Sequence, residues 1–148
     1  MKYSALLLSL IVLLTFTGCQ KDDPPAPPTK TDLISRNWKI TAASGTFPPL
    51  PAVDLLAQLP ACEKDNIIKI QSNGTYTEDE GATKCNASDP QIASSGNWSF
   101  ANNETKLNIL GETFDIITLT ATSLVLKQDV AASGGVPAGT INVTFTAQ

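Results

Sequence analysis

The sequence predicts an all-β protein, an antiparallel meander of eight short strands closed into a barrel, with a short N-terminal helix and a short inserted helix. Three observations predict this class. Short runs that alternate apolar and polar residues recur from Trp38 to Thr146, as in strands that bury one face of a sheet. Tight-turn sequences rich in Gly and Asn separate most of these runs. Charged residues make up only 16% of the chain, below the roughly 25% of an average soluble domain.

Two short helices are predicted near the start of the domain. Thr31 is the predicted N-cap in front of Asp32, and this first helix has only one or two turns. Residues 52–59 carry apolar side chains at helical spacing behind three prolines, and predict an inserted helix that ends at Pro60.

Eight strands are predicted after and around these helices. Asn73-Gly74 favours the type I′ turn of a tight hairpin, and residues 81–95 are predicted to form a loop. Eight strands with one apolar face each can close into a barrel that fills itself or holds one small ligand, and a two-sheet sandwich is the alternative. The predicted strands span residues 38–42, 66–70, 75–79, 97–100, 106–109, 113–119, 123–128 and 140–146.

The start of the chain predicts export and a lipid anchor. Lys2 precedes an uncharged run from Ala5 to Phe16, which is too short to span a membrane and is typical of a signal peptide. The run leads into Thr17-Gly18-Cys19, which resembles the bacterial lipobox whose Cys thiol becomes acylated. We therefore predict a lipoprotein signal peptide over 1–18, a lipidated Cys19 with a Pro-rich tether over 19–29, and the barrel domain over 30–148. An ordinary secretory signal is the alternative.

The residues after Cys19 predict where the protein is placed. Gln20-Lys21-Asp22-Asp23 resembles the charged export tag of lipoproteins of the Bacteroidota, and a generic polar tether is the alternative. The prolines between 24 and 28 form an extended spacer of about 3.1 Å per residue. The predicted location is the outer membrane, with the lipid-anchored domain facing the cell surface.

The composition excludes several function classes. The chain has no His, so it lacks the commonest general base and transition-metal ligand, and Ser-His-Asp and Cys-His catalysis are excluded. The net charge is −4 and becomes −5 once Lys2 leaves with the signal peptide, and no basic stripe is present to bind nucleic acid. We predict a protein that is not an enzyme, has no cofactor or metal site and binds no nucleic acid.

Cys62 and Cys85 are predicted to form a disulfide. Export places the domain in an oxidising compartment, and these two thiols remain once Cys19 is acylated. A redox or metal-binding pair is the alternative, although the C-x-x-C spacing of such pairs is missing.

An acidic group is a second candidate site. Glu78, Asp79, Glu80 and Asp65 offer the carboxylates that Ca²⁺ prefers. In a strand, Glu78 and Glu80 share one face while Asp79 points away. A solvated hairpin end is the preferred interpretation.

Several motifs resemble those of the lipocalin-like lipoproteins of the Bacteroidota, and the resemblance covers about residues 33–147. It implies a small lipocalin-like barrel. Arg36 stands where true lipocalins carry a Gly two residues before the first Trp, so a lipocalin's ligand is not inherited. The motifs are the lipobox, the Pro-rich tether, the helix running into Trp38-Lys39-Ile40, and residues 62–66, 73–76, 80–85 and 96–100.

Six aromatic side chains are the candidate ligand-binding residues. They either line an apolar cavity or pack as a core, since a barrel this small can fill itself. The predicted function is a membrane-anchored lipocalin-like lipoprotein that binds a small apolar or amphipathic ligand without enzymatic activity. The alternative is a structural or interaction protein of the cell envelope, with a filled barrel and no small-molecule ligand. The six residues are Trp38, Tyr76, Trp98, Phe100, Phe114 and Phe145.

Overall fold

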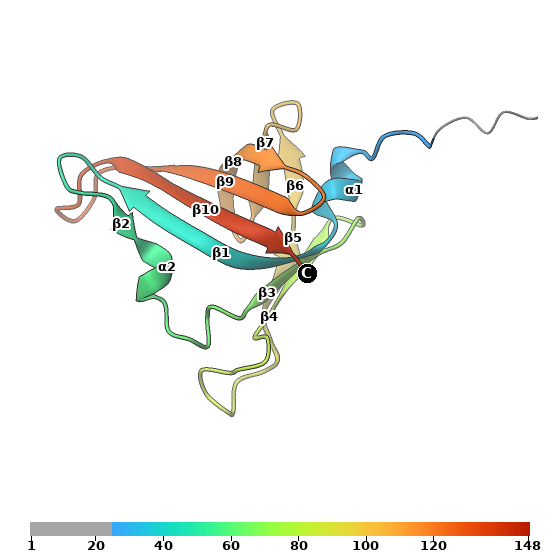
Figure 1. Ribbon diagram of the computed structural model, residues 1–148, viewed down its shortest axis with the longest axis horizontal. Coiled ribbons are helices and arrows are strands. Elements are labelled where there is room, and N and C mark those ends of the chain that lie inside the picture. Colours follow the sequence, from blue (N-terminus) through green and yellow to red (C-terminus); the bar gives the residue numbers. More distant parts are fainter. Residues whose placement is uncertain (1–24) are drawn as a thin grey trace, which may run out of the picture.

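The computed structural model describes residues 25–148 and folds them into one curved antiparallel sheet that nearly closes on itself (Figure 1). The strand order along the sheet is β5-β4-β3-β1-β10-β9-β8-β7-β6, and β2 pairs with β1. The predicted all-β barrel is therefore confirmed. The strands are β1 (Asn37–Thr46), β2 (Val53–Asp54), β3 (Ile67–Ile70), β4 (Thr75–Asp79), β5 (Ile92–Asn97), β6 (Ser99–Ala101), β7 (Lys106–Ile109), β8 (Glu112–Leu119), β9 (Ser123–Val130) and β10 (Gly139–Ala147).

The described residues form ten strands where eight were predicted. The segment 92–95 was predicted as loop, but it belongs to β5 because it pairs with β4. β2 is a two-residue strand inside the segment predicted as helical. β5 and β6 are separated by Trp98 alone, so they are two halves of one stretch of chain.

Trp98 marks the point where the two edges of the sheet meet. The chain pairs with β4 before this residue and with β7 after it. The backbone N–H of Trp98 donates to the carbonyl of Gly74 at 2.9 Å, and its indole N–H donates to the carbonyl of Gln71 at 2.8 Å. The two edge strands, β5 and β6, are thus joined because they are consecutive in the chain and because Trp98 between them forms these hydrogen bonds. They are not joined by backbone pairing of one edge strand with the other.

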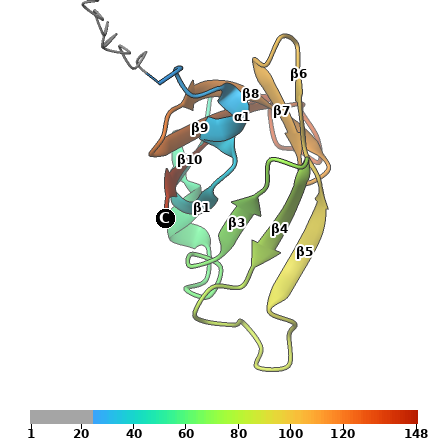
Figure 2. The ribbon, with the colours of Figure 1, turned by 90° about the vertical axis from the view of Figure 1, so that its right-hand side faces the viewer.

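The first helix, α1 (Lys30–Ile34), lies across one end of the barrel, with the loop between β4 and β5 at the other end (Figure 2). The predicted N-cap, Thr31, is wrong, because Thr29 caps the helix. Asp32 is the third helical residue, so its carboxylate reaches back to the Thr29 N–H at 2.9 Å while the Thr29 hydroxyl accepts from the Asp32 N–H at 3.1 Å. Ile34 is fully buried and anchors the helix to the core.

The inserted helix, α2, is shorter than predicted. It spans Leu55–Gln58, and the carboxylate of its N-cap, Asp54, accepts a hydrogen bond from the N–H of Ala57 at 3.0 Å. The predicted extent, 52–59, is wrong because β2 pairs with β1 immediately before the helix. Neither helix of the described residues is long and apolar enough to cross a membrane.

The hairpin between β3 and β4 has a different turn from the predicted type I′. That turn needs a positive φ at both central residues, whereas Gly74 has a φ of +87° and Asn73 is not among the residues with a positive φ. The N–H of Gly74 donates to the carbonyl of Gln71 at 3.2 Å, and the Asn73 side chain accepts from the N–H of Thr75 at 3.1 Å. Gly74 is therefore the fourth residue of a four-residue turn over 71–74.

The buried core lies beneath α1. Trp38 is 1% exposed, and its indole N–H donates to the carbonyl of Ile34 at 2.8 Å, which gives this buried polar group a partner. The ring of Tyr76 lies over Gly96 on the neighbouring strand, where a Cβ atom would come within 2.9 Å of it. These contacts fill the α1 end of the barrel with side chains.

Candidate ligand-binding site

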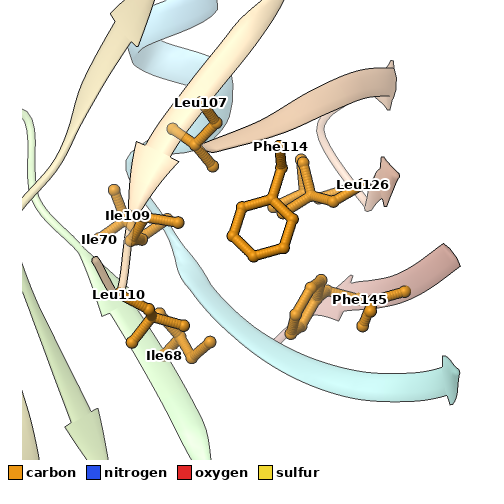
Figure 3. Close-up of a pocket in the computed structure, with 10 residues that line it drawn as sticks. Ile68, Ile70, Leu107, Ile109, Leu110, Phe114, Leu126 and Phe145 are labelled. Carbon is orange, nitrogen blue, oxygen red and sulfur yellow. The ribbon is translucent and has the colours of Figure 1, made fainter. Parts of the chain in front are cut away.

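An apolar cavity of about 160 Å³ lies inside the barrel (Figure 3). We call it the inner cavity. Its size is close to that of an engineered apolar cavity of about 150 Å³ that stays dry and binds benzene. All of the lining residues are hydrophobic, and they are Ile68, Ile70, Leu107, Ile109, Leu110, Phe114, Leu124, Leu126, Val143 and Phe145.

The alternation of the strands places these side chains inside. Leu124 and Leu126 are two residues apart on β9, and Val143 and Phe145 are two residues apart on β10. The two strands pair so that Val143 lies opposite Leu126 and Phe145 opposite Leu124. Because side chains separated by two residues point to the same face, all four project into the barrel.

Two of the six predicted ligand residues, Phe114 and Phe145, line the inner cavity (Figure 3). Trp38, Tyr76 and Trp98 are at most 8% exposed and belong to the core. Phe100 packs edge to face on Trp98, with ring centroids 5.2 Å apart. The roles of these residues in ligand binding stay predictions. The aliphatic residues of the lining were not predicted from the sequence, because only aromatic side chains were considered as ligand contacts. The spacing of Ile and Leu by two residues along the strands is the signal that could have identified them.

A second chamber of about 490 Å³ adjoins the inner cavity. We call it the outer chamber. Ile68 and Phe145 line both spaces and lie between them. Four of the described residues that line the outer chamber are acidic and none is basic. The full lining is Ile40, Leu59, Glu63, Asn66, Ile68, Glu78, Glu80, Cys85, Asp89, Ala93 and Phe145.

Sequence comparison decides the family. Residues 34–126 match the family model of the lipocalin-like domain. The chain belongs to the lipocalin-like family. The match runs from the end of α1 into β9 and therefore covers most of the barrel. No curated protein matches the sequence.

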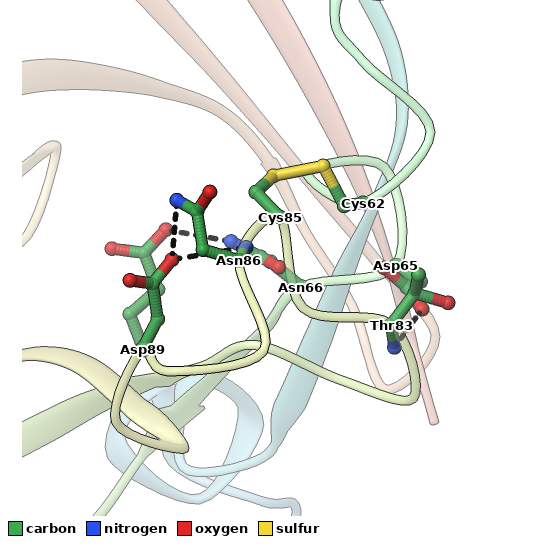
Figure 4. Close-up of a disulfide and its surroundings, with 8 residues drawn as sticks. Cys62, Asp65, Asn66, Thr83, Cys85, Asn86 and Asp89 are labelled. Atoms are coloured by element: carbon green, nitrogen blue, oxygen red, sulfur yellow. Dashed lines mark hydrogen bonds between the residues drawn. A yellow bond between two sulfur atoms is a disulfide. The ribbon is translucent and has the colours of Figure 1, made fainter.

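The disulfide of the lipocalin-like barrel joins Cys62 to Cys85, as predicted, with the Cα atoms 5.2 Å apart (Figure 4). It ties the segment after α2 to the loop between β4 and β5. Within this loop the carboxylate of Asp89 accepts hydrogen bonds from the backbone N–H and the side-chain amide of Asn86, at 3.2 and 3.0 Å. Since Cys85 and Asp89 line the outer chamber, these contacts fix one of its walls.

The acidic residues at the end of β4 and directly after it divide between the two faces of the lipocalin-like sheet, as the strand period predicts. Glu78 and Glu80 line the outer chamber. Asp79 accepts hydrogen bonds from the Lys69 ammonium at 2.6 Å and from the Gln91 amide at 2.8 Å. These bonds, the one from Lys69 first, lower the pKa of Asp79 to about 2.

The calcium interpretation of the acidic group finds no support within residues 25–148. No three Cys, Asp or Glu side chains of this part of the lipocalin-like domain come close enough together to hold a metal ion. The carboxylate of Asp65 instead accepts a hydrogen bond from the backbone N–H of Thr83 at 2.9 Å (Figure 4). The predicted signal peptide over 1–18 and the predicted lipidation site Cys19 lie outside the described residues.

Proposed function

We propose that this lipocalin-like protein is a lipid-anchored, non-enzymatic binder of a small apolar or amphipathic molecule. The inner cavity carries the proposal, because its lining is entirely hydrophobic and its volume is close to that of a cavity that binds benzene. Burying apolar ligand surface contributes about 25 cal/mol per Å². A polar group placed there loses its hydrogen bonds to water without finding a partner, so the wall selects for apolar groups.

Anchoring at the outer membrane through Cys19 is part of the same proposal. The tether leads into α1, and the loop that carries Cys85 lies at the opposite end of the barrel (Figure 2). An anchor on Cys19 would therefore leave the outer chamber facing away from the membrane, toward the surrounding medium. Several acyl chains on one Cys give a firm anchor, since each buried methylene contributes about 0.8 kcal/mol.

The anchor is tested by metabolic labelling with palmitate. We expect the wild-type protein to take up the label and to sediment with outer membranes, and Cys19→Ala to lose the label and leave the membrane fraction. A Cys19→Ala protein that still carries the label would overturn the anchor without touching the binding proposal.

Ligand binding is tested by filling the inner cavity. Val143→Phe adds a ring inside it, and Val125→Phe makes the same change on the other face of the sheet, since Val125 lies between two inward-pointing leucines. Benzene is the probe. We expect it to raise the melting temperature of the wild type and of Val125→Phe, because a ligand that binds the folded state stabilises it, and not that of Val143→Phe.

Two outcomes would overturn the binding proposal. One is a wild-type melting temperature that benzene leaves unchanged, and the other is equal stabilisation of both Phe variants. Near-ultraviolet circular dichroism is the check that each variant keeps its packed core. Native mass spectrometry of the purified protein provides an independent readout, a co-purifying small molecule that Val143→Phe excludes.

A structural or interaction role in the cell envelope is the second candidate function. The observation that favours it is the filled α1 end of the barrel, where Ile34 and Trp38 are almost completely buried. In addition, Leu50 and Val136 are about half exposed on two loops that line a shared surface groove. This role becomes the better explanation if benzene does not bind.

A further inference from the structure

We infer that the ligand is a cationic amphiphile, with an apolar group the size of one ring in the inner cavity and an ammonium or guanidinium group in the outer chamber. This inference rests on the proposed function and narrows its ligand class. It combines two observations: the inner cavity and the outer chamber share part of their wall, and the charges at their junction are of one sign.

The two spaces are positioned to hold one molecule. Ile68 and Phe145 line both of them, so these two side chains form the boundary that the two spaces share. On one side of the pair every lining residue is hydrophobic (Figure 3), and on the other side carboxylates enter the wall. A bound molecule with an apolar end and a polar end has one orientation that satisfies both spaces.

Glu78 lies at the junction. It is the direct cross-strand partner of Ile68 in the pairing of β3 with β4, and side chains opposite each other on one face have Cβ atoms about 5 Å apart. Its carboxylate accepts a hydrogen bond from the Ser94 hydroxyl at 2.9 Å, which leaves further lone pairs for a ligand. A charged group attached to the apolar end of a ligand would meet Glu78 first.

The remaining acidic groups extend the negative charge outward. Glu80 follows two residues later and lines the same chamber, roughly 7 Å further along the chain at the rise of a strand. Glu63 and Asp89 come from the loops on either side. Within residues 25–148, none of these four carboxylates has an ion-pair partner within 4.0 Å.

Two neighbouring lysines bind backbone carbonyls instead of these carboxylates. The ammonium of Lys64, which follows Glu63 in the sequence, donates to the carbonyl of Ala57 at 3.3 Å. The ammonium of Lys84 donates to the backbone carbonyl of Asp89 at 2.7 Å rather than to a carboxylate. By contrast, Asp79 on the outer face is paired with Lys69. The basic partner of the acidic residues on β4 thus lies on the solvent side of the strand, and the carboxylates on the chamber side are left to pair with a cationic ligand. A ligand that carries a carboxylate cannot supply that cation.

The test compares three probes that share one apolar group and differ in charge, namely 2-phenylethylammonium, 2-phenylethanol and phenylacetate. Isothermal titration of the purified protein should give the tightest binding for the ammonium, weaker binding for the alcohol and the weakest for phenylacetate. We expect roughly a tenfold preference for the ammonium over phenylacetate at low ionic strength, since several partly exposed ion pairs of modest strength add up to this ratio. Added salt should reduce the preference.

Charge-removing variants assign the preference to the chamber. Glu78→Gln keeps an oxygen that accepts from Ser94, and should lower the affinity for 2-phenylethylammonium roughly fivefold while leaving that for 2-phenylethanol unchanged. Glu104→Gln is the matched control, because Glu104 is an exposed residue of the turn before β7 that does not line the chamber. It should change neither affinity.

The outcomes separate this inference from the proposed function. If phenylacetate binds as tightly as the ammonium, or if Glu104→Gln weakens the ammonium as much as Glu78→Gln does, the charge inference is overturned and the binder remains. If neither 2-phenylethanol nor benzene binds, the proposed function fails together with the inference that rests on it.

Discussion

Removing the disulfide between Cys62 and Cys85 should lower the free energy of unfolding by about 3.4 kcal/mol. The bridge joins residues that are 23 apart in the sequence. In the chain-entropy model, closing a loop of this length removes about 11.5 cal/mol/K from the unfolded chain, which gives that value at 25 °C. For a domain of this size the melting temperature should fall by roughly 10 °C.

The variant to compare with the wild type is Cys62→Ala/Cys85→Ala, unfolded with urea and followed by tryptophan fluorescence. Trp38 and Trp98 are both buried, so their emission shifts when the core opens. The slope of the free energy against urea should rise in the variant, because an unfolded chain without the cross-link exposes more surface. Wild-type protein treated with a reductant should match the variant, and the reductant should leave the variant itself unchanged.

A loss smaller than about 1 kcal/mol with an unchanged slope would refute this reasoning. It would mean that the unfolded chain without the bridge already keeps residues 62 and 85 close together, so that the cross-link removes little of its conformational entropy.

Three further predictions rest on single contacts. Trp38→Phe removes a buried hydrogen bond and leaves a void, and should cost roughly 1–3 kcal/mol in a urea titration; an unchanged midpoint would show that this bond contributes nothing. Gly96→Val places a side chain where the Tyr76 ring already lies within 2.9 Å of an ideal Cβ, and should cost roughly 1–3 kcal/mol in the same titration; an unchanged midpoint would show that the ring moves away without cost. Hydrogen bonds, first of all from Lys69, lower the pKa of Asp79 from its ordinary 3.8 to about 2. The resulting stabilisation is present above about pH 4 and is lost as the pH falls toward 2. Urea midpoints measured across this window should therefore fall less steeply for Asp79→Asn, and equal slopes would contradict the assignment.

The strands that were predicted from the sequence are those whose pattern of apolar and polar residues can be recognised within the strand itself. Residues 140–146 alternate apolar and polar side chains throughout, residues 123–128 carry a short apolar run between polar residues, and β10 and β9 include them. Residues 92–95 read Ile-Ala-Ser-Ser and carry no such pattern. They form a strand because β4 offers them hydrogen-bond partners, and no local window of sequence contains that information.

The candidate site was found only in part for the same reason. Phe114 and Phe145 were selected as aromatic side chains, and both line the inner cavity. The pairing of Ile68 with Glu78 depends on the register of β3 and β4. That register follows from the turn between them, whose predicted type was wrong.

The sequence by itself determined the all-β class, the inward faces of most strands and the partners of the disulfide, because each follows from the spacing or the count of residue types along the chain. The tertiary structure alone decided which aromatic rings fill the barrel and which border a cavity. It also decided that the carboxylates of Glu78 and Glu80 face the outer chamber, while Asp79 pairs with Lys69 on the other face of the sheet. The physical reason is that burial and charge pairing depend on distances between strands, and these are set when the sheet curves and closes at Trp98.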